Sequence, residues 1–271
     1  MTIESIMYSK FHLGLKYLSF YATVSNKKGH GIHSPFVFEF ITKVLGDRTV
    51  YPEYETVEKL RNVLLQDKTV LSVDDFGAGS AKDKTPTRTI SSIAASAAKP
   101  PEFGQLLYRM VKYYKPRRIV EMGTSLGLST AYLSLAGPGS KIITMEGAPS
   151  VAARARQNFD SLNLKNIAIV EGNFDQTLVS VLNELPQVDF VFVDGNHRQE
   201  PTERYFKQLL PAVHNESILI FDDIHWSRQM EQAWEGIIQN SIVRCSIDLF
   251  FAGILFFRHE FKEKQHFRIR F

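Results

Sequence analysis

Three acidic side chains follow two of the apolar runs in this sequence. Asp194 comes directly after residues 189–193, and Asp222 and Asp223 come directly after residues 217–221. Like charges held close together are costly unless a cation neutralises them. Carboxylate oxygens are the ligands that Mg²⁺ prefers, with Mn²⁺ and Ca²⁺ as alternatives. The pattern predicts a metal site, although either aspartate of the pair could instead cap the next helix while Asp194 faces a cofactor.

A histidine near these acids is the predicted proton acceptor. His197 lies three residues after Asp194, and an imidazole titrates close to neutral pH. The competing interpretation is a histidine that only orders its loop. Two further side chains, His225 and Trp226, follow the paired aspartates, and we expect them to wall an acceptor pocket.

A glycine-containing turn follows an earlier apolar run. Residues 121–130 read Glu-Met-Gly-Thr-Ser-Leu-Gly-Leu-Ser-Thr, and Glu146 ends the next run 25 residues after Glu121. Glycines between a strand and a helix let a ligand approach the backbone and the helix N-terminus, and an acid after the next strand can accept both hydroxyls of a ribose. The dinucleotide fingerprint does not match, because Glu121 occupies the place of its first glycine. The alternative is a tight turn and a surface glutamate.

The elements that must position these residues are strands and helices in alternation. Five apolar runs, at 119–122, 141–145, 167–170, 189–193 and 217–221, are each followed by a turn and a helix-like stretch. This alternation predicts a parallel sheet with helices on both faces. Two more runs, at 243–250 and 253–258, are joined by too few residues for a crossover helix. We therefore expect them to form an antiparallel pair at one edge.

The first part of the chain has a helical pattern. Mixed three- and four-residue apolar spacing predicts helices over 4–24, 35–46, 53–67, 87–99 and 103–114. We therefore expect two domains, a helical extension or lid over residues 1–99 and a catalytic domain over 100–271. A second glycine motif, at residues 75–80, is predicted to be a surface or lid loop, because Pro86 follows it and no strand with a ribose-binding acid comes next.

Length and composition describe a globular chain. It has 271 residues, of which 44% are hydrophobic and 23% charged, so a substantial core can form. No segment is apolar enough to predict a membrane span, and the N-terminus lacks the pattern of a signal peptide. The only cysteine, Cys245, excludes an internal disulfide and a cysteine-cluster metal site. We expect a cytoplasmic protein.

The net charge of +3 is unevenly distributed. Residues 1–118 carry 18 basic and 11 acidic side chains, whereas residues 119–243 carry 8 and 15. A basic segment can attract an anionic substrate, nucleic acid or a membrane surface. We favour a solvated helical surface, because lysines are common on helix faces.

The glycine turn, the acid at 146 and the strand pattern together resemble the class I S-adenosylmethionine-dependent methyltransferases. The resemblance covers about residues 100–258. It is closest to the metal-dependent small-molecule O-methyltransferases of the catechol, caffeoyl-CoA and sugar types, which have a segment similar to Pro100–Leu107 before the first strand. It implies a Rossmann-like α/β fold with a seven-stranded, mostly parallel sheet in the order 3-2-1-4-5-7-6.

The resemblance also implies functions for individual residues. S-adenosylmethionine would be the methyl donor, with Mg²⁺ as a second cofactor bound at Asp194, Asp222 and Asp223. His197 and Asp194 would be catalytic, although these relatives have a lysine base or an aspartate where this chain has His197 or Asn196. The implied cofactor-binding residues are Glu121, Gly123, Ser125, Gly127, Ser129, Glu146, Gly172, Asn173, Phe174 and Asp194.

The expected partner is a small-molecule acceptor with a hydroxyl group, and a homodimer is left open. Two alternatives remain. One is a methyltransferase that acts on nucleic acid or protein and uses the basic N-terminal half to bind it. The sequence has no Asn-Pro-Pro-Tyr-type motif after the fourth strand, which speaks against this alternative. The other is a non-catalytic protein that binds the cofactor. The sequence does not identify the acceptor.

Overall fold

The structure, a computed structural model, describes residues 7–24, 33–73 and 87–271. Its contacts define two compact units. The terminal unit contains Met1–Gly46 and Leu182–Phe271, and the central unit contains Asp47–Val181. The glycine motif at residues 75–80 lies outside the described residues. The domain boundary predicted between residues 99 and 100 lies inside the central unit and stays a prediction.

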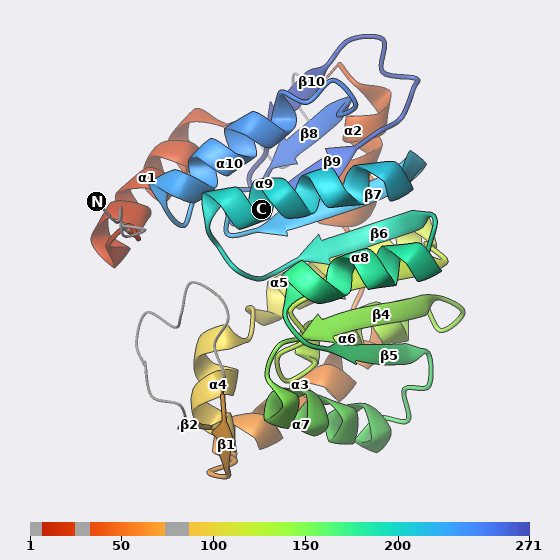
Figure 1. Ribbon diagram of the computed structural model, residues 1–271. Coiled ribbons are helices and arrows are strands. Elements are labelled where there is room, and N and C mark those ends of the chain that lie inside the picture. Colours follow the sequence, from red (N-terminus) through yellow and green to blue (C-terminus); the bar gives the residue numbers. More distant parts are fainter. Residues whose placement is uncertain (1–6, 25–32, 74–86) are drawn as a thin grey trace. The chain divides into compact units, whose positions relative to one another are not determined.

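The central unit is built on three parallel strands in the order β3-β4-β5 (Figure 1). Apolar residues fill the middle of β3 and β4 because helices cover the sheet, as the sequence predicts. The strands are β3 (Arg118–Met122), β4 (Lys141–Glu146) and β5 (Ile167–Glu171). The helices that alternate with them are α5 (Pro101–Tyr114), α6 (Leu128–Ala136), α7 (Pro149–Ser161) and α8 (Phe174–Glu184).

Helices α3 (Pro52–Gln66) and α4 (Ile90–Ala97) add a layer to this unit. Their buried side chains form one cluster with α5 and α6, which includes Tyr54, Tyr108 and Tyr132. The helix predicted over 87–99 instead begins with a short strand, β2 (Thr87–Thr89), paired with β1 (Val70–Ser72). The hydroxyl of Thr89 accepts the N–H of Ser92, so Thr89 caps the helix and fixes its later start.

The terminal unit contains five strands in the order β10-β8-β9-β7-β6. β6 and β7 are parallel, β9 is antiparallel to both β7 and β8, and β10 is parallel to β8. The predicted antiparallel pair at the C-terminal end is therefore confirmed. The strands are β6 (Val188–Val193), β7 (Val213–Asp222), β8 (Cys245–Asp248), β9 (Ala252–Phe256) and β10 (Gln265–Arg268).

The expected strand order holds within each unit, with β5-β4-β3 matching 3-2-1 and β6-β7-β9-β8 matching 4-5-7-6. The α/β class with mostly parallel strands is confirmed. The sequence missed β10, because its four residues, Gln-His-Phe-Arg, are mainly polar and alternate between half-buried and exposed. Such a pattern is typical of a short edge strand.

Helices α9 (Gln199–Leu209) and α10 (Arg228–Ile238) pack on each other and cover one face of the terminal strands (Figure 1). Helix α2 (Pro35–Phe40) lies on the other face, where Phe36 and Phe40 contact the ring of Phe256. A five-residue π-helix, Ile41–Leu45, follows α2 directly. The helix predicted over 35–46 is therefore present with a change of helix type.

Helix α1 (Lys10–Thr23) has two apolar sides, and only one is covered. Phe20 is buried against the ring of Phe250. Phe11 is 78% exposed. It precedes Phe20 by nine residues, and at about 100° per residue this separation places the two side chains on opposite sides of the helix. The aromatic side chains of α1 are therefore only partly covered within this chain. Among the described residues, no helix has the length and apolarity needed to cross a membrane.

Candidate functional site

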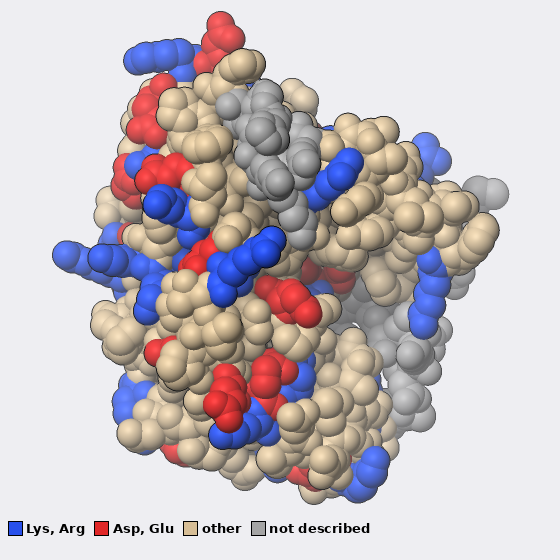
Figure 2. Space-filling model, turned by 180° about the vertical axis from the view of Figure 1, so that it is seen from behind, with Lys and Arg blue, Asp and Glu red and all other residues tan. Residues whose placement is uncertain are grey.

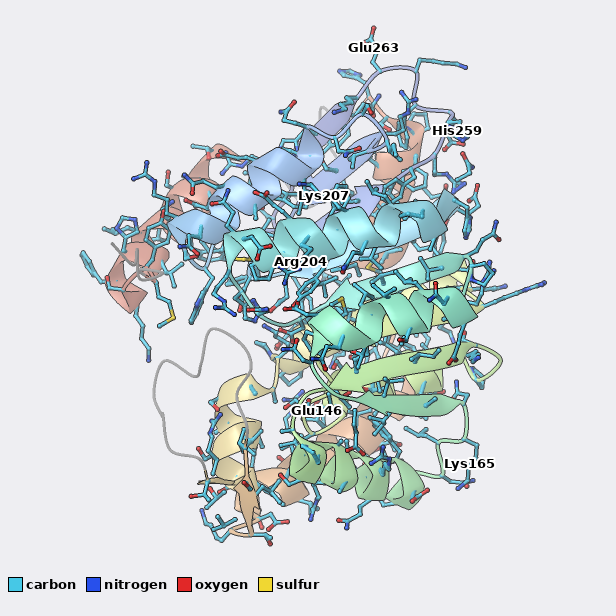
Figure 3. The ribbon with its side chains drawn as sticks, viewed as in Figure 1. Glu146, Lys165, Arg204, Lys207, His259 and Glu263 are labelled. Atoms are coloured by element: carbon cyan, nitrogen blue, oxygen red, sulfur yellow. The ribbon has the colours of Figure 1, made fainter. Side chains whose placement is uncertain are left out.

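The carboxyl ends of β3, β4 and β5 meet at one edge of the central unit. The registers place Met122 beside Met145 and Glu146 beside Glu171. Gly123 and Gly172 come directly after the outer two strands, and Glu146 ends the middle one (Figure 3). The structure therefore brings the predicted glycines and the predicted ribose-binding acid to the same edge, where open α/β sheets bind ligands.

Glu121 is a buried hydrogen-bond centre. Its side chain is inaccessible to solvent, and its carboxylate accepts hydrogen bonds from the hydroxyls of Ser129 (2.6 Å), Thr130 (2.5 Å) and Thr144 (2.7 Å). These bonds join β3 to β4 and to α6. They compensate the cost of burying a carboxylate, so Glu121 has a structural function whether or not it also contacts a cofactor.

Glu146 is held in place by backbone donors. Its Oε2 accepts the N–H of Ser125 at 2.8 Å, and its Oε1 accepts the N–H of Ala148 at 3.0 Å. Each carboxylate oxygen has a second acceptor position. The side chain is half-buried, so part of it is accessible to solvent. The position predicted to bind ribose is therefore fixed before any ligand arrives.

Backbone geometry explains the glycines of the turn. Gly123 and Gly127 have φ values of 109° and 82°, which side-chain-bearing residues rarely adopt. A Cβ atom on Gly127 would lie 2.4 Å from the ring of Phe159. Packing against α7 therefore requires the second glycine, in addition to any contact with a ligand. Ser125 also has a positive φ, 48°, and this conformation belongs to the turn that directs its N–H to Glu146.

Asn173 and Phe174 follow β5, as the sequence indicated. The side chain of Asn173 accepts the N–H of Asp175 at 3.0 Å, and its carbonyl accepts the N–H groups of Gln176 and Thr177. Asn173 therefore starts α8. Phe174 is half-buried in the first turn of the helix. Their contact with an adenine ring stays a prediction.

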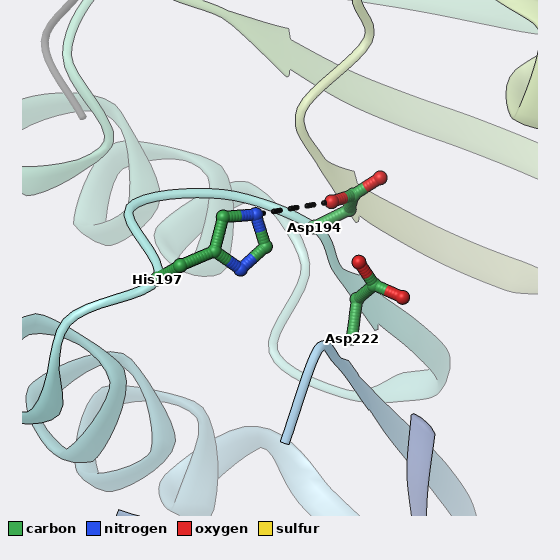
Figure 4. A group of neighbouring side chains, drawn as sticks. All are labelled: Asp194, His197 and Asp222. Carbon is green, nitrogen blue, oxygen red and sulfur yellow. Dashed lines mark ion pairs between the residues drawn. The ribbon is translucent and has the colours of Figure 1, made fainter. Parts of the chain in front are cut away.

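The acidic edge of the terminal unit contains a compact group of three side chains. One ligand atom from each of Asp194, His197 and Asp222 lies within 4.8 Å of the others. The register of β6 and β7 places Val193 beside Phe221, which is why the next residue of each strand meets at this edge. Asp222 is buried, while Asp194 and His197 are partly exposed. Figure 4 shows the three side chains converging from the two strand ends and the following loop.

His197 pairs with the acid that the sequence placed beside it. Its Nε2 lies 3.4 Å from Oδ1 of Asp194 (Figure 4). The loop is fixed by Asn196, whose amide donates to the hydroxyl of Tyr205 at 2.9 Å and accepts from the guanidinium of Arg198 at 2.8 Å. The positive φ of Asn196, 60°, turns the chain back toward the strand end. Local geometry therefore fixes the position of the imidazole.

Asp223 differs from the expected third ligand. Within the described residues, it is not a member of the compact group, which contains His197 instead. Its backbone is left-handed, with φ of 54°, and its N–H donates to the carbonyl of Phe251 at 2.7 Å. The carbonyl of Asp223 also accepts the N–H of Trp226. The left-handed turn thus separates the two neighbouring aspartates, and metal binding by Asp223 stays a prediction.

His225 lies between two carboxylates. Its Nδ1 is 2.9 Å from Glu231, its Nε2 is 2.9 Å from Asp248, and its ring stacks on Phe250. Burial acts to lower the pKa of His225, but the hydrogen bonds to Asp248 and Glu231 outweigh it and raise the pKa above the ordinary value. The sequence suggested a pocket wall here. It gave no signal for Glu231 or Asp248, which come from α10 and β8.

Comparison with known proteins finds a family match for part of the chain. Residues 120–224 match the family described as a methyltransferase domain. A catechol O-methyltransferase from Niastella koreensis is 27% identical over 127 residues, which cover 46% of this chain and 57% of that protein. The chain thus spans little more than half the length of this curated relative.

Solved structures share the fold. An SAH-bound Podospora anserina methyltransferase, PaMTH1, has a TM-score of 0.58 and 12% identity, covering 93% of this chain and 97% of its own. A Bacillus cereus O-methyltransferase in complex with SAH has a TM-score of 0.55 and 17% identity, covering 82% and 97%. The solved structures show a shared Rossmann-like fold, and the family match and the catechol O-methyltransferase show that this part of the chain is similar to methyltransferases.

Proposed function

We propose that this protein transfers the methyl group of S-adenosylmethionine to a hydroxyl oxygen of a small molecule, with the help of a divalent metal ion. The acceptor oxygen forms a bond to the methyl carbon as the bond from that carbon to sulfur breaks, and the hydroxyl proton passes to a base. The observation that carries the proposal is the group of Asp194, His197 and Asp222, in a chain whose residues 120–224 match a methyltransferase domain.

The central unit supplies the donor site in this proposal. Glu146 accepts the ribose hydroxyls, the turn from Gly123 to Gly127 receives the methionine part, and Asn173 with Phe174 borders the adenine. The support is that Glu146 and both strand-following glycines lie at one sheet edge. Holding the donor in one orientation is itself catalytic, because the sulfonium methyl is already activated.

The acidic group of the terminal unit fits a divalent cation. Two carboxylates supply hard oxygen ligands, and the low exposure of Asp222 makes a neutralising charge valuable there. Carboxylate oxygens are preferred ligands of both Mg²⁺ and Mn²⁺. When bound, the metal would lower the pKa of the acceptor hydroxyl. Asp194 and Asp222 would hold it.

His197 takes the acceptor proton in this proposal, and Asp194 orients its imidazole. The support is the 3.4 Å separation between Nε2 and the Asp194 carboxylate. A carboxylate beside an imidazole stabilises the protonated ring that forms when the proton arrives. If His197 instead ligates the metal, its removal lowers metal affinity as well as the rate.

Charge distribution supports a small acceptor. On the face drawn in Figure 2, blue and red side chains are interspersed, and no single basic stripe runs across it. Nucleic-acid sites present clustered Lys and Arg to the phosphates. The acceptor's own structure is left to experiment.

The test combines binding and product detection. Calorimetry should show binding of S-adenosylhomocysteine to the wild-type protein. Incubation with S-adenosylmethionine, Mg²⁺ and a panel of catechols and cell metabolites should give products heavier by one methylene group, detected by mass spectrometry. A chelator should stop turnover and Mg²⁺ should restore it. A protein that does not bind S-adenosylhomocysteine would refute the assignment, whereas turnover that survives the chelator would refute only the metal.

A further inference from the structure

A partly buried polar cluster in the terminal unit connects the N-terminal helix to the turn that carries the paired aspartates. Its centre is Glu231 of α10. The ammonium group of Lys16 donates to both carboxylate oxygens at 2.6 and 2.8 Å, and the hydroxyl of Tyr8 donates to Oε2 at 2.8 Å. Lys16 also lies 4.4 Å from the centre of the Tyr8 ring. Two side chains from the N-terminal segment thus converge on one carboxylate.

His225 continues the cluster toward the strands. It bridges Glu231 and Asp248 with two contacts of 2.9 Å. Asp248 is almost fully buried, and its second oxygen accepts the N–H of Phe250 at 2.7 Å. The contacts run without a break from Lys16 through Glu231 and His225 to Asp248. Removing one member of such a network leaves its partners without a hydrogen bond.

The backbone of the turn at residues 222–226 is fastened at the same place. Tyr8 donates its N–H to the carbonyl of Trp226 at 3.3 Å, and Asp223 donates its N–H to Phe251 at 2.7 Å. The left-handed conformation of Asp223 costs energy for a residue with a side chain, so contacts around it must maintain it. These contacts come from α1's N-terminal side and from the loop after β8.

We propose that Lys16 of α1 and Glu231 of α10 are positioning residues that hold His225, and with it the turn at residues 222–226, so that Asp222 stays at the acidic edge. The inference that these residues hold the turn does not depend on the proposed function. The further inference that they affect metal binding rests on it. The N-terminal helix, in this view, is part of the site's framework.

The main experiment measures amide hydrogen exchange in peptides that contain residues 222–226. Glu231→Gln and Lys16→Met should each speed exchange in this turn by about tenfold, the equivalent of one lost charged hydrogen bond. Lys16→Arg should retain much of the protection, because it keeps a cation at the same position. Lys10→Met is the control on the same helix, since Lys10 is exposed.

A second control separates bracing from general loss of stability. Arg258→Met removes ion pairs to Glu216 and Glu260 in the same unit. It should lower overall stability and leave exchange in the turn slow under native conditions. If Glu231→Gln and Lys16→Met leave the turn's exchange unchanged, or if Arg258→Met speeds it equally, the bracing is refuted.

Binding of Mn²⁺ alone, followed by electron paramagnetic resonance, tests the consequence for the acidic edge. Glu231→Gln should weaken Mn²⁺ binding several-fold and leave S-adenosylhomocysteine binding to the protein unchanged. If the wild type binds no Mn²⁺, the metal part of the proposed function fails, and hydrogen exchange still decides the bracing. If Mn²⁺ binds equally to wild type and variant while exchange is faster, the turn is braced but Asp222 does not depend on it, which overturns that part of the inference.

Discussion

The two sheet edges of this protein use acidic side chains in opposite ways. In the central unit, Glu121 and Glu146 each accept hydrogen bonds from hydroxyls or backbone N–H groups, so their charges are compensated locally. In the terminal unit, Asp194 and Asp222 converge on each other and on an imidazole. The first arrangement holds the carboxylates in fixed positions, and in the proposed function Glu146 receives hydroxyl groups there. The second concentrates negative charge, which is typical of a cation site.

The largest effect should come from breaking the acidic edge. Asp194→Ala should lower kcat/KM by about a thousandfold or more, since a metal ion contributes several kcal/mol to a transition state and Asp194 also orients His197. Asp223→Asn is the matched control and should be much milder, because Asp223 is outside the compact group. Steady-state kinetics at saturating Mg²⁺ measures both. An equally severe Asp223→Asn would mean that the turn changes when metal binds.

Replacing His197 distinguishes two functions of its imidazole at the acidic edge, general base and metal ligand. His197→Gln should reduce kcat by about a hundredfold if the imidazole is the general base. Mn²⁺ affinity should then change little. Calorimetry and kinetics on the same preparation separate the two functions, because loss of Mn²⁺ affinity in His197→Gln would identify the imidazole as a ligand.

In the central unit the expected effects are smaller and differ between the two glutamates. Glu146→Ala should weaken S-adenosylhomocysteine binding by about 1.5–3 kcal/mol, the value of hydrogen bonds to a charged group. Glu121→Gln should lower the free energy of unfolding by about 2 kcal/mol, because a buried amide cannot accept from three hydroxyls as a carboxylate does. Calorimetry measures the first and denaturant unfolding the second. If Glu121→Gln weakened S-adenosylhomocysteine binding as much as Glu146→Ala does and left the free energy of unfolding unchanged, the structural function of Glu121 would be contradicted.

The smallest effect is a pH dependence in the polar cluster. Burial acts to raise the pKa of Glu231, but hydrogen bonds from Lys16, His225 and Tyr8 outweigh it and hold the pKa below its ordinary value. A carboxyl group whose pKa is lower in the folded state stabilises that state at pH values above its ordinary, unfolded-state pKa. This stabilisation is lost as the pH falls through the folded-state pKa. The stability difference between wild type and Glu231→Gln should therefore narrow as pH is lowered from about 7 to about 3. A constant difference across this range would show that the charge of Glu231 is not important for stability.

Several features of the fold followed from local patterns. The apolar runs predicted the strands from β3 to β9 because parallel strands covered on both faces must be apolar along their length. The helix predicted over 87–99 started late because Thr89 is a better cap than a helix residue. β10 was missed because pairing with β8, and not its own polar sequence, makes it a strand.

The sequence by itself determined which chemical groups stand at the strand ends. Asp194, Glu146 and Gly123 directly follow or end apolar runs, and the carboxyl ends of parallel strands must share an edge. The tertiary structure decided which of these groups meet. His197 joined Asp194 and Asp222, and Asp223 did not, because one left-handed residue rotated the chain between neighbouring aspartates. The contact of Lys16 with Glu231 joins residues 215 positions apart, and no local pattern can specify a pairing over that distance.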